Sequence, residues 1–196
     1  MAGCNLHSII QSADSCNSDY AGVGDRVYFG LISDLDVKPT VDDFIEDKNE
    51  YESDVFNSLQ GKLHAIDIKQ DSGQVTGEDA EGVDGYTNVG TFVIDKNLDA
   101  AAATLRGIKM LNTVWFIPDG KGKYYVLYSR TKRTKVTAPF DSGTTYDSDH
   151  GHTVTITVAP CEFNECKWTP PSTKPDLDDW CADITPGSGS GSGSGD

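Results

Sequence analysis

Two neighbouring segments of the sequence are apolar on both of their faces, and they constrain the fold more than any other feature. Residues 112–118 read NTVWFIP and residues 123–129 read KYYVLYS, and the turn-forming sequence PDGKGK at 118–123 joins them. Strand alternation places valine and phenylalanine of the first segment on one face, and tryptophan and isoleucine on the other. A strand that is apolar on both faces must be covered on both. These segments therefore predict a hairpin that other elements cover on each side.

Six further segments have the alternation or the composition of β-strands. They are residues 25–32, 61–69, 73–79, 87–95, 134–140 and 151–160. The turn-forming sequence DSG at 71–73 predicts that the second and third of these segments form a hairpin. In the last segment Val154, Ile156 and Val158 face one way and threonines face the other, which indicates a half-buried strand.

One segment has the pattern of a helix. Residues 98–110 follow Asn97, whose side chain can cap a first turn. Leu98, Ala101, Leu105 and Ile108 recur at spacings of three and four and form one apolar stripe. We expect this helix to cover part of the second face of the 112–129 hairpin. The predicted fold class is therefore mainly β (α+β), an antiparallel β-sandwich or barrel with one flanking α-helix.

The composition divides the chain into four parts. Residues 1–24 are polar and predict an irregular N-terminal arm, and residues 25–160 hold all the predicted strands. Residues 161–186 are rich in Cys, Trp, Pro and Asp and are expected to be a tail outside the β domain. Residues 187–196 read GSGSGSGSGD, which is a flexible, linker-like composition.

A long acidic loop at residues 33–60 lies inside the predicted domain. It exceeds an ordinary connection between strands and carries scattered apolar side chains. These side chains are Val41, Phe44, Ile45, Tyr51, Val55, Phe56 and Leu59. A solvated loop has no need of such residues, so they either dock on the parent domain or reach a neighbouring molecule.

The charge and the cysteines limit the partners and the compartment. The formal net charge is 16 − 31 = −15, which argues against a surface that grips nucleic-acid phosphates. No apolar run reaches the length of about 20 residues that a membrane helix needs, and the first residues do not read as a secretory signal. Five cysteines lie near the chain ends without zinc-knuckle spacing, which favours free thiols in a reducing cytoplasm.

Three motifs invite a catalytic or binding interpretation, and none is complete. Residues 141–144 read DSGT, as in aspartic proteases, but those enzymes need two aspartates and the motif occurs once. His150 and His152 are weak candidates for a metal, because no third ligand accompanies them. The aromatics of the 112–129 hairpin are expected in the core rather than on a stacking platform. We therefore predict no enzyme, no catalytic residue, no cofactor and no metal site.

The resemblance to a known family comes from the order of the predicted elements more than from any single motif. The residues that carry this impression are CNL near the start, DRVYFGLISDLDV, FVIDKNLDAAAATLRGIKM, VWFIPDGKGKYYVLY and DSDHGHTVTITV. Over residues 1–160 the chain resembles the tail tube proteins of tailed bacteriophages. Its local sequence pattern is most similar to that of tail tube-like virion proteins of phages that infect gut Bacteroidetes.

The resemblance implies a structural role in a virion tail, assembled in the bacterial host cytoplasm. Six copies would form a ring, rings would stack into a tube that contacts other tail or connector proteins, and genome DNA would pass through without specific binding. On this interpretation Phe44, Ile45, Val55, Phe56 and Leu59 would lie in a subunit interface, and carboxylates would face the bore. A head-completion or tail-terminator ring protein is an alternative within virions. A β-sandwich module that binds glycan or protein is the alternative outside them.

Overall fold

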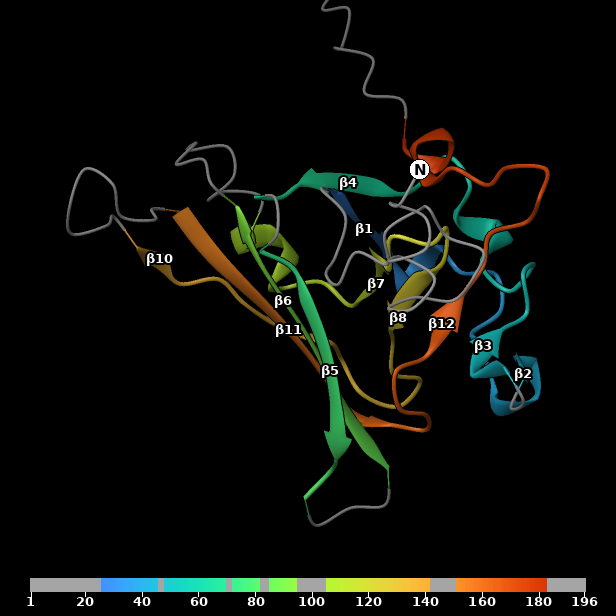
Figure 1. Ribbon diagram of the computed structural model, residues 1–196, viewed down its shortest axis with the longest axis horizontal. Helices are drawn as coiled ribbons and strands as arrows, with labels where there is room; N and C mark the ends of the chain where they lie inside the picture. The colour runs from blue at the N-terminus through green and yellow to red at the C-terminus, as the bar shows by residue number, and fades with distance from the viewer. Residues whose placement is uncertain are drawn as a thin grey trace, which may run out of the picture.

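The computed structural model describes residues 26–45, 48–69, 72–81, 85–94, 105–141 and 151–182. These residues form two β-sheets with one short α-helical segment at 105–108 and several 3-10 turns. Figure 1 shows the sheets as two layers, with β5, β6 and β11 running together on one side and β1, β7 and β8 on the other. The predicted mainly β fold with one flanking helix is confirmed.

The larger sheet has seven strands in the order β2-β3-β12-β8-β7-β1-β4. Its strands are β1 Arg26–Leu31, β2 Phe44–Ile45, β3 Glu50–Tyr51, β4 His64–Asp67, β7 Thr113–Pro118, β8 Tyr124–Leu127 and β12 Lys167–Trp168. All neighbours in this sheet are antiparallel except β12 and β3, which are parallel. Strands from the two ends of the chain are therefore interleaved in one sheet.

The smaller sheet has the order β10-β11-β6-β5, and β9 also pairs with β11. Its strands are β5 Gln74–Asp79, β6 Tyr86–Ile94, β9 Lys135–Thr137, β10 Phe140–Asp141 and β11 Gly151–Cys161. Every pair in it is antiparallel. Thr157 lies opposite both Val89 of β6 and Lys135 of β9, so β11 is central, β5 forms one border of the sheet, and β9 and β10 form the other.

The hairpin predicted at residues 112–129 is confirmed. β7 and β8 pair from Trp115 with Leu127 to Pro118 with Tyr124. Asp119 organises the turn, because its carboxylate accepts hydrogen bonds from the backbone N–H groups of Lys121 (2.8 Å) and Lys123 (3.1 Å).

The hairpin predicted between residues 61–69 and 73–79 is wrong. β4 pairs with β1 in the larger sheet, and β5 pairs with β6 in the smaller one. Ser72 closes the bend with a hydrogen bond from its hydroxyl to the carbonyl of Lys69, and the same oxygen accepts from the N–H of Val93. The bend therefore passes the chain from one sheet to the other instead of folding it back on itself.

One hydrophobic core fills the space between the two sheets. Trp115, Ile117 and Leu127 enter it from the larger sheet, and β6 and β11 contribute alternate residues from the smaller one. Gly90 on β6 allows this close approach, because a Cβ there would lie 2.7 Å from Cδ1 of both Ile117 and Leu127. The helical residues Leu105 and Ile108 also belong to this core.

A second core covers the other face of the larger sheet. Its floor includes Val114, Phe116 and Val126 of the doubly apolar hairpin. The covering side chains come from the loop after β1 and from the C-terminal segment, and they include Phe56, Leu59, Trp168, Leu177 and Trp180. The helix was expected to cover part of this face, and its described residues, 105–108, do not. Loop and C-terminal aromatics cover it, and the two helical apolar residues described pack between the sheets.

The domain boundary predicted at residue 160 is also wrong. β11 runs through to Cys161, β12 is a strand of the larger sheet, and the 3-10 turn η5 (Leu177–Trp180) buries Leu177 and Trp180 completely. Residues 161–182 are thus part of the β domain. The predicted arm at 1–24, most of the helix at 98–110 and the Gly/Ser segment at 187–196 lie outside the described residues.

Candidate functional site

The loop residues expected at a subunit interface are taken up largely by the chain's own core. Phe56 and Leu59 are completely buried, and Phe44 stacks on Phe163 with ring centroids 3.6 Å apart. Ile45 and Val55 are half-buried. The interface expectation is therefore wrong for Phe44, Phe56 and Leu59, because their side chains have no surface left for a neighbour. The loop docks on its parent domain.

The two histidines considered as metal ligands, His150 and His152, are not seen together in a site. The His152 side chain is buried at the end of β11, beside the ring of Phe140 at 5.2 Å, and neither of its ring nitrogens has a hydrogen-bond partner. His150 and the residues 142–144 of the DSGT motif lie outside the described residues. Within the described part of the chain, no three His, Cys, Asp or Glu residues are grouped to hold a metal ion.

The hairpin aromatics lie where the sequence predicts them. Trp115, Tyr124 and Tyr128 are buried and Tyr125 is half-buried beneath the ammonium group of Lys167, 4.7 Å from the ring centroid. They cannot form an exposed stacking platform for bases or sugars.

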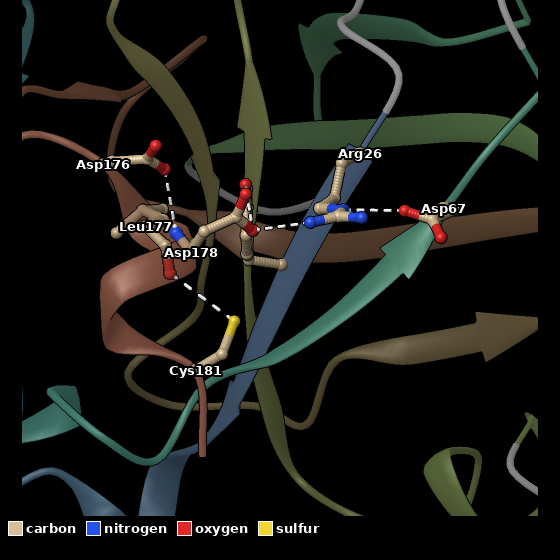
Figure 2. A network of polar contacts seen from close by, with 7 residues as sticks. Arg26, Asp67, Asp176, Leu177, Asp178 and Cys181 are labelled. Carbon is tan, nitrogen blue, oxygen red and sulfur yellow. Dashed lines mark hydrogen bonds and ion pairs between the residues drawn. The ribbon is translucent and has the colours of Figure 1, made fainter. Parts of the chain in front are cut away.

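A polar network holds the C-terminal segment against the larger sheet (Figure 2). The guanidinium group of Arg26 on β1 donates to Asp67 of β4 at 2.6 Å and to Asp178 of η5 at 2.8 Å. The hydroxyl of Tyr28 also donates to Asp178, at 3.0 Å. Burial, followed by this hydrogen bond, raises the pKa of Tyr28 above its ordinary value. The network joins three segments that are far apart in the chain.

This network positions the segment rather than forming a reactive site. Asp176 caps η5 by accepting from the N–H of Asp178 at 2.9 Å, and Leu63 pairs with Trp180 and Ala182 through backbone hydrogen bonds of 3.1 and 2.9 Å. The side chains of Arg26, Asp67 and Asp178 stay substantially exposed, so water screens their ion pairs. The packing of Leu177 and Trp180 therefore contributes more than these ion pairs to holding the C-terminal segment on the larger sheet.

Two buried thiols lie beside a small internal cavity. Cys161 and Cys166 line a cavity of about 20 Å³ together with Tyr51 and Tyr128. Burial raises the pKa of Cys161 from 9.0 to about 11 and that of Cys166 to about 12. Cys181 is free and half-buried. Because the thiolate is the reactive form, both buried thiols are inert at neutral pH in the folded protein.

Thiol labelling tests this arrangement. In a Cys4→Ser/Cys16→Ser variant at pH 8, we expect iodoacetamide to modify Cys161 about a hundredfold more slowly in the folded protein than in urea, since a shift of two pKa units lowers the thiolate fraction by that factor. Peptide mapping by mass spectrometry measures the rates, with Cys181 as the internal comparison. Equal rates for Cys161 in the folded and unfolded protein would contradict its burial.

The raised pKa values of these thiols also determine how the stability of the fold changes at alkaline pH. A thiol whose folded pKa is raised stabilises the fold fully below its unfolded pKa. For Cys161 this contribution is present below pH 9 and is lost as the pH rises toward 11.

No described residue covers the outer face of the smaller sheet, and this face is poor in charge. Two rows of residues cross it in register, and the direction of alternation places them all on the side away from the core. They are Lys135, Thr157, Val89 and Thr76 in one row and Thr137, Thr155, Thr91 and Gln74 in the next. Each of these side chains is half-buried or exposed. A threonine-rich surface of this kind is unusual on a chain of net charge −15.

The two borders of this sheet have opposite charge. The β5 border carries Glu78 and Asp79 and continues to Glu81, all exposed. The β9 border carries Lys135 and follows the exposed run at 130–133, so that four of the six residues from 130 to 135 are cations. The net charge of −15 gives no indication of this basic patch. The signal that identifies it is the RTKRTK run in an otherwise acidic chain.

No family model, no curated protein and no solved structure matches this chain. Among the described residues, no helix has both the length and the apolar character needed to span a bilayer. In the part of the chain that the structure describes, the smaller sheet has an uncovered outer face and two open borders, and such surfaces suit contact between proteins.

Proposed function

We propose that this chain is a self-assembling virion structural protein, a tail tube subunit whose copies form stacked rings around a passage for DNA. The observation that carries the proposal is the smaller sheet. Among the described residues, this sheet has one face packed on the core, one face that nothing covers, and no further strand beyond β5 at one border or beyond β9 and β10 at the other. Free sheet borders are sites where a further strand can pair.

The layers of the domain support a role as a building unit. The larger sheet is closed on its outer face by the loop at 33–60 and by the C-terminal segment. Among the described residues, it is the smaller sheet whose outer face stays open to a neighbour. The sequence resemblance to tail tube proteins adds a second, independent line of support.

On this proposal a hexameric ring places the uncovered face toward the passage. A bore lined mainly by the threonine hydroxyls of these two rows would neither hold nor strongly repel a phosphate backbone. The remaining carboxylates of the chain would act over a Debye length of about 8 Å at physiological salt. The protein would be found in the virion tail, with other tail or connector proteins as partners.

Negative-stain electron microscopy of the purified protein, concentrated at near-neutral pH, tests this function. We expect rings or hollow tubes, and sedimentation velocity should show the corresponding large species. A monodisperse monomer up to millimolar concentration would overturn the proposal, because a tube subunit must associate with itself.

A further inference from the structure

The positive charge of this acidic chain is concentrated in one stretch of the sequence. Residues 105–140 contain eight of the 16 Lys and Arg residues but only one of the 31 Asp and Glu residues, Asp119. Asp119 lies in the turn of the β7–β8 hairpin, where backbone N–H groups donate to its carboxylate. The opposite end of the hairpin is flanked by the segments 106–111 and 130–135, and neither contains a carboxylate.

The fold brings these two segments into contact. The guanidinium group of Arg133 donates to the backbone carbonyls of Lys109 and Leu111, the latter at 3.1 Å, and so satisfies the end of the helical segment. The hydroxyl of Thr134 donates to the carbonyl of Thr113 at 2.6 Å. Cations from both segments therefore lie near one another, and their side chains are exposed.

The same place exposes apolar side chains. Leu105 and Ile108 point into the core, while Arg106, Lys109 and Met110, at spacings of three and four, are exposed. Met110 is 76% exposed and the following leucine is 42% exposed. Of the five large apolar side chains exposed in the described part of the chain, three lie within residues 105–140. We define the basic apolar surface as Arg106, Lys109, Met110, Leu111, Lys132 and Arg133.

We propose that the basic apolar surface binds an anionic lipid bilayer from one side. Cationic side chains gain free energy near a negatively charged membrane surface, and exposed apolar side chains gain more by entering the boundary between headgroups and acyl chains. Met110 and Leu111 supply the apolar part, and the four cations supply the electrostatic part. This inference does not rest on the proposed function, since it names a different partner from another copy of the chain.

The combination of groups favours a bilayer over a nucleic acid. A phosphate backbone would attract the cations but would leave Met110 and Leu111 in water, because nucleic-acid binding without aromatic stacking is carried by charge. The net charge of −15 does not prevent the contact. At 0.1 M salt, charges further than about 10 Å from the membrane are largely screened, so the groups nearest the lipid decide the interaction.

Flotation of the full chain with lipid vesicles tests the proposal, because floating vesicles separate bound protein from large protein assemblies. We expect binding to vesicles with 30% phosphatidylglycerol in phosphatidylcholine and none to phosphatidylcholine alone, and we expect the binding to weaken strongly in 1 M salt. Lys109→Glu/Lys132→Glu should lower the bound fraction at least about tenfold. Met110→Ser/Leu111→Ser, which leaves the charge unchanged, should lower it at least about threefold. Arg133 is left unaltered because of its hydrogen bonds to the helical segment.

A matched control separates this surface from the overall charge. Lys38→Glu/Lys174→Glu changes the net charge by the same amount at exposed positions outside residues 105–140 and should bind nearly as the unaltered chain does. Far-UV circular dichroism and thermal unfolding verify that each variant folds. The inference is overturned if the unaltered chain does not float, if the control loses as much binding as Lys109→Glu/Lys132→Glu, or if Met110→Ser/Leu111→Ser binds unchanged. Displacement by duplex DNA at an equal phosphate concentration would also overturn it. The microscopy of rings and tubes is a separate result, so the proposed function stands or falls independently.

Discussion

Replacement of Trp168 by alanine is expected to lower the free energy of unfolding by about 3–5 kcal/mol. The indole is completely buried and its ring lies 5.2–5.5 Å from those of Phe56, Phe116 and Trp180. Its Nε1 donates to the carbonyl of Ser53 at 3.3 Å. Since a domain of this kind is stable by about 5–15 kcal/mol, the substitution removes a large share of that stability.

Urea unfolding followed by far-UV circular dichroism measures this effect without depending on tryptophan fluorescence. Met110→Ala is the control, because that side chain is 76% exposed and its truncation should change the free energy of unfolding by less than about 0.5 kcal/mol. A cost below about 1 kcal/mol for Trp168→Ala would show that the C-terminal segment is not part of the core.

The elements that local alternation controls were predictable from sequence. Val154, Ile156 and Val158 are all completely buried, as their period of two indicates, and threonines occupy the other face of β11. The hairpin at 112–129 is apolar on both faces and is covered on both. In each case one strand's own residues determine the outcome, so no knowledge of distant segments is needed.

The elements that depend on distant segments were not predictable. Trp168 and Trp180 stand in a Pro- and Asp-rich stretch whose composition is typical of a solvated tail, yet the open outer face of the larger sheet provides a place for their rings. Likewise, β4 and β5 are joined by a turn-like sequence but pair with different strands. A local pattern says that a residue is apolar, and it does not say which of two faces will bury it.

The interface residues that the resemblance implies were chosen from the apolar composition of the 33–60 loop alone. The sequence suggested contact between copies through apolar side chains of the 33–60 loop, and the structure buries most of them within one chain. The borders of the smaller sheet were missed because their charges matter only once β5 and β9 are known to lie at opposite sides of one sheet. Because β5 and β9 are far apart in the sequence, no local pattern shows that they belong to the same sheet.

Replacement of Phe56 by alanine distinguishes a loop that docks on its parent from one that reaches a neighbour. Phe56 is completely buried, with ring centroids at 5.1 Å from Phe116 and 5.5 Å from Tyr51. We expect the substitution to lower the free energy of unfolding by about 3–5 kcal/mol, because it leaves a cavity in a core that the surrounding rings cannot close. Thermal and urea unfolding at a concentration below that of assembly measure the effect on the isolated chain.

The control is Val41→Ala in the same loop, where the side chain is 45% exposed and little change in stability is expected. If the loop belonged to an interface instead, Phe56→Ala would leave the unfolding of the isolated chain unchanged and would raise the concentration needed for assembly. Because Phe56 is buried within its own chain, we expect the substitution to act on the stability of that chain and not directly on assembly. Stability of the single chain must fall first, and assembly should suffer only to the extent that fewer chains are folded.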